Sequence, residues 1–375
     1  MRKTVIDGTP VNARMKGLGY VLRGLLDVLN RNRPSFLRKV FVDESYAAAA
    51  RERWPHLPLE AVRSKPAIAW EQWILPRRLA DGSAVRHFTG RDRVAPSLAS
   101  RTTMYLFEIP DYRIEAARRS GTGLYGRLSD AYNLLNFKRV AGEIAMFVVS
   151  SVSTARDLVD RYGVSEERIR LVYPGIEESF FVPPPPEARD AARRAFAEGR
   201  PYVLHFCTGD PRENSATALK AFAQACPRIP GDIVLLVVGV EGDHAQWLDR
   251  EVDALGIAGR TLTVPFLSEE DLIAVYRGAA AYLDPTRYEG FGRQILEAMA
   301  CGVPVISSRV TSVPEVAGDA AILLDPYDTE GFAESLVRVL RDSSLADEMR
   351  KRGLANVQRF RWQRAAEELL PILSA

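Results

Sequence analysis

The sequence has no apolar run long enough to cross a bilayer. Its longest apolar stretches among 375 residues, such as Ala145–Val149 and Ile233–Val240, fall far short of the roughly 20 residues that a membrane-spanning helix needs. A secretory signal is not expected either, because Asp7 and Gly8 interrupt the apolar segment that should follow Met1–Lys3. These absences predict a cytoplasmic protein.

Cysteine and histidine are both scarce. The three cysteines are widely spaced, at Cys207, Cys226 and Cys301. This spacing fits neither a disulfide framework nor a C-x-x-C metal motif, so reduced thiols are expected. The four histidines are His56, His87, His205 and His244. They lack the spacing and the acidic companions of a zinc site, so we expect no metal and no cofactor. His87 stands at the end of a predicted strand and is a candidate for lining a cleft.

Two common nucleotide-binding motifs are also missing. Neither G-x4-GK[ST] nor G-x-G-x-x-G follows a predicted strand, which argues against a P-loop NTPase and a nicotinamide enzyme. The arginines are scattered rather than interleaved with aromatic residues, and the sequence contains no nucleic-acid-binding module. We therefore expect no nucleic acid partner.

The small net charge of +2 hides an asymmetry along the chain. Residues 1–185 carry 29 Lys and Arg against 20 Asp and Glu, a net charge of +9. Residues 186–375 carry 21 against 28, a net charge of −7. A positive half is suited to an anionic acceptor or an acidic membrane surface, but an ordinary solvated surface rich in arginine explains the same counts. The sequence leaves both interpretations open.

Short apolar runs alternate with amphipathic helical segments along the whole chain, as in β-α-β units with parallel sheets. In the first half the predicted strands are 4–6, 39–42, 85–88, 102–107, 143–150 and 169–172. In the second half they are 202–207, 233–238, 261–265, 281–283, 303–307 and 321–324. The pattern predicts an α/β protein with two doubly wound, Rossmann-like parallel sheets. Ligands of such sheets bind beyond the carboxyl ends of the strands, so we expect the site in a cleft between two domains.

A proline-rich segment divides the two halves. Glu177–Pro186 ends in four consecutive prolines, and because proline continues neither a strand nor a helix, we expect a stiff connection there. The predicted domains are 1–182 and 201–357, with a linker region over 183–200. The apolar spacing of residues 362–373 predicts a helix within the terminal segment 358–375.

The densest candidate site is the segment Tyr288–Ile306, in which a loop joins a predicted strand to a predicted helix. Gly290 and Gly292 permit close approach of the backbone, and the amides at the start of the helix favour an anion such as a diphosphate. Glu297 on the helix is placed to accept the hydroxyls of a ribose. Glu289 on the loop is placed to reach the hydroxyls of a second sugar.

This segment closely resembles the EGFG-x4-E signature of the retaining GT-B glycosyltransferases of family 4, the glycosyl transferases of group 1. Val172–Ile176 and Asp325–Asp328 are similar to the same family, and the likeness covers nearly the whole chain. The resemblance implies two domains that face each other across a cleft, and a terminal helix that crosses back to the N-terminal domain. It also implies a nucleotide-sugar donor on the C-terminal domain and an acceptor on the N-terminal domain.

The resemblance further implies roles for individual residues. The implied catalytic residues are Glu289, Arg212 and Glu108. The implied donor-binding residues are Gly290, Phe291, Gly292, Arg293, Glu297, Asn214, Gly17 and Gly19.

The sequence also departs from the family at three places. Glu213 stands where a lysine beside the diphosphate is expected, which leaves Arg212 as the main cation. Arg293 is unusual within the glycine loop and is either a replacement for the missing charge or an exposed helix residue. Phe107 and Glu108 stand where many relatives have a His-Asp pair, and Glu108 is either its substitute or a solvated cap.

Together with these residues, the resemblance implies a metal-independent, retaining glycosyltransferase with a nucleotide-diphosphate sugar as donor and no cofactor. The acceptor is a glycan, a lipid-linked sugar or a small molecule, which suggests polysaccharide biosynthesis. The expectation includes peripheral contact with an anionic membrane at its inner face. Two alternatives stay open: a non-catalytic nucleotide-sugar sensor, suggested by Glu213 and Phe107, and an epimerase or phosphorylase of the same fold.

Overall fold

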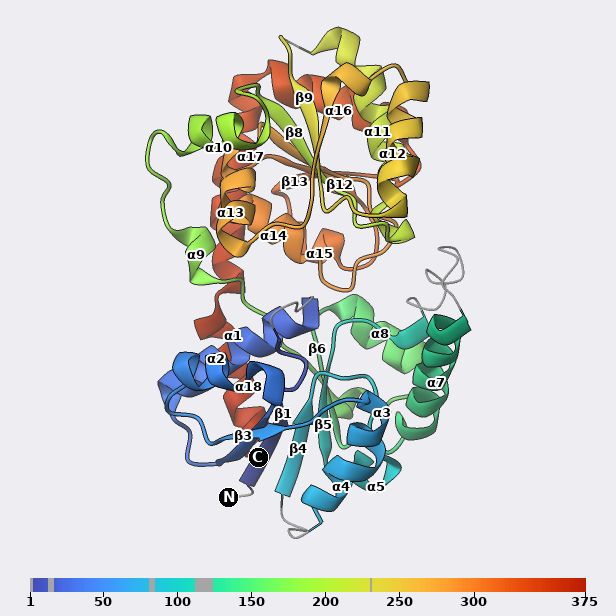
Figure 1. Cartoon of the computed structure of the whole chain (residues 1–375), viewed down its shortest axis with the longest axis vertical. Helices are drawn as coiled ribbons and strands as arrows, with labels where there is room; N and C mark the ends of the chain where they lie inside the picture. The colour runs from blue at the N-terminus through green and yellow to red at the C-terminus, as the bar shows by residue number, and fades with distance from the viewer. Residues whose placement is uncertain (1–2, 13–16, 81–84, 112–123, 230) are drawn as a thin grey trace. The chain divides into compact units, whose positions relative to one another are not determined.

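The structure is a computed structural model and describes residues 3–12, 17–80, 85–111, 124–229 and 231–375 (Figure 1). The chain divides into two compact units. Unit 1 comprises Met1–Gly175 and Phe360–Ala375, and unit 2 comprises Ile176–Arg359. The chain therefore passes from one unit to the other twice.

Unit 1 is built on a seven-stranded sheet with the strand order β3-β2-β1-β4-β5-β6-β7. Every neighbouring pair in it is parallel. The strands are β1 (Lys3–Asp7), β2 (Leu37–Asp43), β3 (Leu59–Val62), β4 (Val85–Thr89), β5 (Thr102–Leu106), β6 (Met146–Val149) and β7 (Ile169–Leu171). Nearly all residues of β4, β5 and β6 are buried, as expected for strands covered on both faces.

Helices connect these strands and cover the sheet of unit 1 (Figure 1). They are α1 (Gly17–Asn32), α2 (Ala47–Arg53), α3 (Ala67–Ala69), α4 (Leu75–Arg78), α5 (Pro96–Ala99), α7 (Leu124–Val140), α8 (Val152–Tyr162) and α18 (Trp362–Ser374). A π-helical turn, η2 (Trp70–Ile74), joins α3 to α4. Helix α8 begins at Ser151, whose hydroxyl accepts from the Thr154 amide, and ends at Gly163 in the left-handed conformation.

Unit 2 contains a six-stranded parallel sheet with the order β10-β9-β8-β11-β12-β13. The strands are β8 (Tyr202–Phe206), β9 (Val234–Val238), β10 (Thr261–Val264), β11 (Ala281–Asp284), β12 (Val305–Ser308) and β13 (Ala321–Leu324). The helices are α9 (Glu178–Phe181), α10 (Ala188–Phe196), α11 (Ser215–Ala225), α12 (Asp243–Ala254), α13 (Glu269–Gly278), α14 (Arg293–Ala300), α15 (Val313–Ala317), α16 (Thr329–Arg341) and α17 (Ser343–Asn356).

The predicted fold class is confirmed. Each predicted strand occurs, with its ends shifted by a few residues, and both sheets are parallel. The prediction missed β3, the edge strand at Leu59–Val62, because only its last residue is fully buried and Glu60 and Ala61 have low strand propensity.

The segment expected to be a stiff connection is partly helical. Residues 178–181 form α9, and the side chain of Arg277 on α13 donates to the Val182 carbonyl at 2.6 Å. The predicted linker region 183–200 likewise contains α10, which packs against α13. The prolines do stop α9, but the residues before them are docked on unit 2, so the units divide at Gly175 rather than at residue 182.

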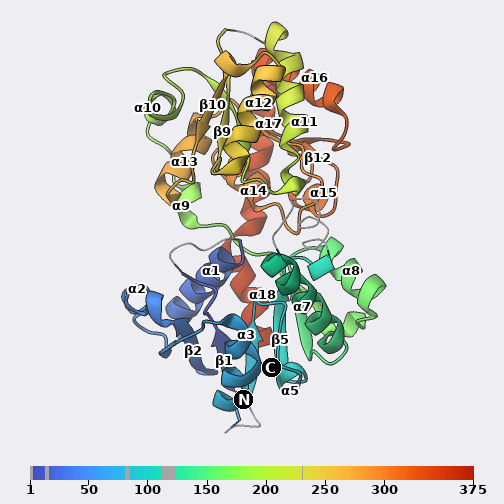
Figure 2. The same cartoon turned by 45° about the vertical axis from the view of Figure 1, so that its right-hand side comes forward.

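The C-terminal helix α18 packs within unit 1, beside α1 (Figure 2). Trp362 fills the space next to two glycines, since a Cβ on Gly24 would lie 2.0 Å from the indole and a Cβ on Gly175 would lie 2.4 Å from the Trp362 backbone nitrogen. At the other end of the helix, the Thr4 hydroxyl donates to the Leu373 carbonyl at 2.6 Å. Strand β1 and α18 thus share one core.

Candidate active site

The candidate site of unit 2 lies where β8, β11 and β12 end. After β11, the loop 285–292 leads into α14, whose N-cap is Gly292 with a φ of 84°. No side chain at the N-cap accepts a hydrogen bond from the first helical turn, because glycine has none to offer. A helix start without a side-chain cap suits an anion, and the anion role that the glycine loop predicted stays a prediction.

The backbone of Glu289 is fixed by the loop after β12. Its amide donates to the Thr311 hydroxyl at 3.0 Å, and its carbonyl accepts from the hydroxyls of Thr311 and Ser312 at 2.8 and 2.9 Å. These bonds hold the backbone, whereas the carboxylate is only partly buried. The side chain of neighbouring Phe291 is buried.

Glu297 is held in an ion-pair network rather than displayed on the surface. Its carboxylate accepts from the Arg293 guanidinium and from the Tyr276 hydroxyl, the latter at 3.0 Å, and its side chain is 4% exposed. Arg293 also pairs with Glu177. Burial alone would lower the pKa of Arg293, but the carboxylates of Glu297 and Glu177 raise it, so the guanidinium stays charged.

Arg293 is therefore not the exposed helix residue that the sequence left as one interpretation. Its side chain is 17% exposed and lies between two carboxylates. Glu297 follows Arg293 by four residues and therefore lies one helical turn further along α14. The ribose role of Glu297 and the phosphate role of Arg293 both stay predictions.

The predicted main cation, Arg212, is paired within its own turn. Its guanidinium donates from Nε to both carboxylate oxygens of Asp210 at 3.1 and 3.0 Å, and from Nη2 to Oδ2 at 2.7 Å. The Arg212 carbonyl accepts from the Arg287 amide and the Thr286 hydroxyl, which ties the loop after β8 to the loop after β11. Arg212 therefore lies at the edge of the sheet, where the Asp210 carboxylate neutralises part of its charge.

Glu213 accepts from the backbone amide and the hydroxyl of Thr208, at 2.7 and 2.6 Å. Burial raises its pKa to about 7, despite these hydrogen bonds. Asp284 at the end of β11 is fully buried, and burial raises its pKa too. Two acidic groups therefore occupy the part of the site where the family resemblance implies a lysine.

The Asn214 side chain links neighbouring loops through hydrogen bonds. Its amide donates to the carbonyls of Pro285 and Pro326 at 2.8 and 2.7 Å, and its side-chain oxygen accepts from the Thr217 hydroxyl. It adopts the left-handed conformation, with a φ of 55°, and begins α11. These bonds join the loops after β8, β11 and β13. Its contact with a donor remains a prediction.

Comparison with known families decides what unit 2 is. Residues 187–355, nearly the whole unit, match the family described as "Glycosyl transferases group 1". Unit 2 is a group 1 glycosyltransferase domain. The segment that carried the predicted resemblance, from Glu289 to Glu297, lies inside the matched region.

Curated relatives support the same group. The chain is 34% identical over 169 residues to "O-antigen chain mannosyltransferase B" of Escherichia coli, a match that covers 45% of this chain and 44% of that protein. It is 30% identical over 254 residues to "D-inositol 3-phosphate glycosyltransferase" of Acidothermus cellulolyticus, covering 63% and 55%. The chain thus spans about half the length of the curated relatives it matches.

Solved structures confirm the fold of the whole chain. The Anabaena protein HepE in complex with UDP-glucose aligns over 100% of both chains with a TM-score of 0.77 and 17% identity. Sucrose-phosphate synthase from Thermosynechococcus elongatus aligns over 99% of this chain and 98% of its own with a TM-score of 0.75 and 20% identity. The group 1 domain therefore belongs to a chain with the GT-B fold, which has two Rossmann-like domains.

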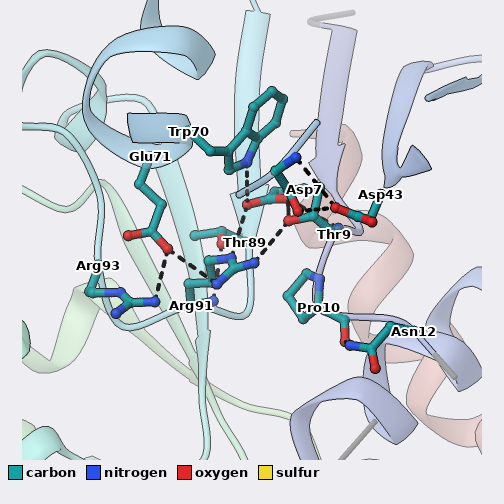
Figure 3. A network of polar contacts seen from close by, with 11 residues as sticks. Asp7, Thr9, Pro10, Asn12, Asp43, Trp70, Glu71, Thr89, Arg91 and Arg93 are labelled. Carbon is teal, nitrogen blue, oxygen red and sulfur yellow. Dashed lines mark hydrogen bonds and ion pairs between the residues drawn. The ribbon is translucent and has the colours of Figure 1, made fainter. Parts of the chain in front are cut away.

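Outside the group 1 domain, unit 1 carries a buried charge network that the sequence analysis missed (Figure 3). Asp7 at the end of β1 accepts from the Thr9 amide and hydroxyl and from the Trp70 indole at 3.1, 2.6 and 3.4 Å. Arg91 lies 3.5 Å from the Asp7 carboxylate and 3.2 Å from that of Glu71. Arg93 bridges Glu71 and Asn133 at 2.9 and 2.8 Å.

This network fixes the loop after β1 and the loop after β4 at the carboxyl edge of the sheet. Burial raises the pKa of Glu71, an effect that Arg93 and Arg91 oppose. Buried charges are costly unless paired, and here two carboxylates meet two guanidinium groups. Glu71 sits on a π-helical turn, and such turns frequently occur at functional sites. No spacing motif signals these residues, because they converge only in the folded unit.

The other candidates of unit 1 are more dispersed. Gly17 is the exposed first residue of α1, and a Cβ there would meet nothing within 4 Å, whereas Gly19 is buried. Residues 13–16 before them lie outside the described part of the chain. Glu108 follows β5 and is partly buried. Phe107 packs on Tyr105 with ring centroids 5.2 Å apart.

His87 does not stand at a strand end as predicted. It lies in the middle of β4, is 1% exposed, and contacts the Thr102 hydroxyl at 3.1 Å. Burial lowers its pKa, so it is a neutral core residue at pH 7. Among the described residues, no three His, Cys, Asp or Glu side chains converge as a metal site requires.

Proposed function

We propose that the protein is a glycosyltransferase that moves a sugar from a nucleotide-diphosphate sugar to a carbohydrate or lipid-linked acceptor. The observation that carries the proposal is the glycine loop of the group 1 domain, which ends at an uncapped helix start beside Glu289. A diphosphate at this position gains the helix dipole and the first-turn amides. The names of the relatives, an O-antigen mannosyltransferase among them, support a role in polysaccharide synthesis.

Transfer needs stabilisation of the departing diphosphate. In the proposed site the amides of α14 do most of this, because Arg212 shares its charge with Asp210 and Glu213 adds a carboxylate. In this proposal Glu289 orients the donor sugar, and the hydrogen bonds of its backbone to Thr311 and Ser312 support that role. Neither function requires a metal or a cofactor.

Retention of the anomeric configuration belongs to the proposal through the family resemblance. The acceptor hydroxyl attacks the anomeric carbon on the face from which the diphosphate leaves, and the departing phosphate oxygen takes the hydroxyl proton. The bond between sugar and diphosphate breaks as the new glycosidic bond forms. A strong enzymic base is then unnecessary, which suits a chain with Phe107 and Glu108 in place of a His-Asp pair.

Thermal-shift measurements with UDP, GDP, dTDP and ADP test the donor class first. One nucleotide should raise the melting temperature, since a ligand that binds only the folded state stabilises it. A panel of sugars on that nucleotide, incubated with an acceptor extract, should then yield a glycosylated product with a retained anomer. If no nucleotide binds, the proposal is wrong.

A nucleotide-sugar sensor is the second candidate, because Arg212 is already paired and Glu213 is acidic. A sensor would bind the nucleotide sugar without releasing sugar. An epimerase would return an isomer of the nucleotide sugar, and a phosphorylase would require inorganic phosphate. The same assay thus distinguishes the four functions.

The proposal places the protein in the cytoplasm, in contact with the inner face of the membrane where lipid-linked acceptors are found. Unit 1 carries 31 Lys and Arg against 20 Asp and Glu, a net charge of +11, and unit 2 carries 19 against 28, a net charge of −9. Among the described helices, none is both long and apolar enough to cross a bilayer. In this proposal, unit 1 contacts the membrane surface through its positive charge and its exposed apolar side chains.

A further inference from the structure

Unit 1 exposes an unusual number of large apolar side chains on two helical segments. In the described residues ten such side chains are exposed, and five of them lie on the α3-η2 segment or on α7. They are Ile68, Trp73 and Ile74 on the first and Leu128 and Leu135 on the second. We name these five residues the apolar surface of unit 1.

One side of the α3-η2-α4 segment is buried in unit 1, and the other side is exposed to solvent. Trp70, Glu71 and Leu75 are at most 2% exposed, and the Trp70 ring packs edge-on against Phe41 at 5.2 Å. Trp73 on the same turn is 56% exposed. The segment therefore buries Trp70, Glu71 and Leu75 on one side and exposes the large apolar side chain of Trp73 on the other.

Helix α7 adds a second exposed stripe next to the first. Leu128 and Leu135 are seven residues apart and so share a helix face, and they are 61% and 67% exposed. The two segments are neighbours because Arg93 hydrogen-bonds to Glu71 on η2 and to Asn133 on α7 at once. Both views show α3 beside α7 (Figures 1 and 2).

On the first of these two segments, all exposed charged side chains are positive. Within residues 63–80 the exposed charged side chains are Arg63, Lys65, Arg77 and Arg78. The single acidic residue of this stretch, Glu71, is buried in the ion-pair network. At the end of α7, Lys138 and Arg139 are exposed as well. Arg78 pairs with Glu60 on β3, so Arg63, Lys65 and Arg77 supply the positive charge beside the α3-η2 part of the apolar surface.

We infer that the apolar surface of unit 1 docks on an anionic phospholipid bilayer. Tryptophan and branched aliphatic side chains insert at the level of the headgroups, and lysine and arginine beside them gain from anionic lipid. A second copy of the chain fits less well, because a symmetric contact would bring the same basic residues together. The inference rests on the proposed function in one respect: a lipid-linked acceptor explains why the protein would bind a bilayer.

Co-sedimentation of the full chain with vesicles tests the inference. Vesicles of phosphatidylcholine with about 30% phosphatidylglycerol should pellet the protein, and plain phosphatidylcholine vesicles should pellet far less of it. Salt of about 0.5 M should release the protein, because the Debye length then falls to about 4 Å. The doubly substituted variant Trp73→Asp, Ile74→Asp should bind at least about tenfold more weakly, and Arg77→Glu about fivefold or more.

Phe266→Asp is the matched control, because Phe266 is 57% exposed but belongs to unit 2. It should bind vesicles like the unsubstituted protein. Brominated lipid should quench part of the tryptophan fluorescence, and Trp73→Phe should remove most of that quenching. Equal pelleting of the double variant and the unsubstituted protein would overturn the inference. So would a dimer in sedimentation velocity that the double variant abolishes, without any vesicle binding.

Nucleotide binding separates this inference from the proposed function. The double variant should bind the nucleoside diphosphate in calorimetry as the unsubstituted protein does, which also shows that it is folded. Sugar transfer without vesicle binding would overturn the docking inference and leave the proposed glycosyltransferase function in place. Vesicle binding without nucleotide binding would leave the surface in place and overturn the glycosyltransferase.

Discussion

The carboxylate of Glu297 decides how the donor site of unit 2 can be tested. Because Glu297 pairs with Arg293 in a buried place, Glu297→Gln should lower the free energy of unfolding of unit 2 by about 2–4 kcal/mol. Urea denaturation measures this loss. The double variant Arg293→Leu, Glu297→Gln should lose less than the sum of the two single variants, since each single variant already breaks the pair. Additive losses would contradict the coupling.

The ribose role of the same residue needs a separate measurement. Calorimetry with the nucleoside diphosphate, at a temperature where Glu297→Gln is still folded, should show binding weaker by about 1–3 kcal/mol. Tyr276→Phe is the control, because it removes a hydrogen bond to Glu297 and leaves the carboxylate in place. Unchanged affinity of the folded Glu297→Gln variant would reduce Glu297 to a structural ion pair.

Glu213 predicts a pH-dependent stability of unit 2. Its pKa is raised by burial from 4.5 to about 7 in the folded chain, so the folded state holds the proton more tightly than the unfolded state. Its contribution is fully favourable below pH 4.5 and is lost as the pH rises through 7. Glu213→Gln should therefore gain about 1 kcal/mol relative to the unsubstituted protein between pH 5 and 8, after allowance for partial exposure.

Thermal unfolding at several pH values measures that difference. Glu270→Gln, on the exposed side of α13, is the matched control for loss of a glutamate charge. A difference for Glu213→Gln that does not change with pH would show that this carboxyl titrates like an exposed one.

At the scale of elements, the short helix α9 joins the start of unit 2 to its core. Phe180 is 1% exposed and its ring centroid lies 6.2 Å from that of Tyr276 on α13. Phe180→Ala should lower the free energy of unfolding of unit 2 by about 3 kcal/mol, because it leaves a cavity against α13. Val182→Ala, at an exposed position of the same segment, should have little effect in urea denaturation. Equal effects would mean that α9 is not docked.

The sequence could predict every strand of the two sheets except the edge strand β3, because each buried strand is a short apolar run with clear ends. It could not predict α9, since the prolines that follow Val182 dominate the local pattern while the docking on Arg277 and Tyr276 is tertiary. The glycine loop could be predicted because its residues are adjacent in the sequence. The pairing of Arg293 with Glu177 was missed because the two residues are 116 positions apart.

At the scale of the whole molecule, unit 1 depends on a helix from the far end of the chain. Trp362 on α18 is 5% exposed and packs against Gly24 and Gly175. Trp362→Ala should lower the free energy of unfolding of unit 1 by about 3–5 kcal/mol. Calorimetry should resolve this as a lower melting transition for unit 1 alone, identified because the nucleotide proposed to bind unit 2 does not shift it.

Trp247→Ala provides the matched control, because Trp247 packs on the core of unit 2. It should lower only the transition that the nucleotide raises. If Trp362→Ala moved both transitions equally, the two units would unfold as one, and α18 would not act on unit 1 alone.

The discontinuity of unit 1 also has a consequence for synthesis on the ribosome. Unit 2 is one continuous segment, so it can fold as soon as it has emerged. Residues 1–175 emerge earlier but must wait for the closing helix, which is translated only after the whole of unit 2. Until then the face of α1 that receives Trp362 stays uncovered, and the nascent first segment is a natural client for chaperones. The order of synthesis is thus the reverse of the order in which the two units can be completed.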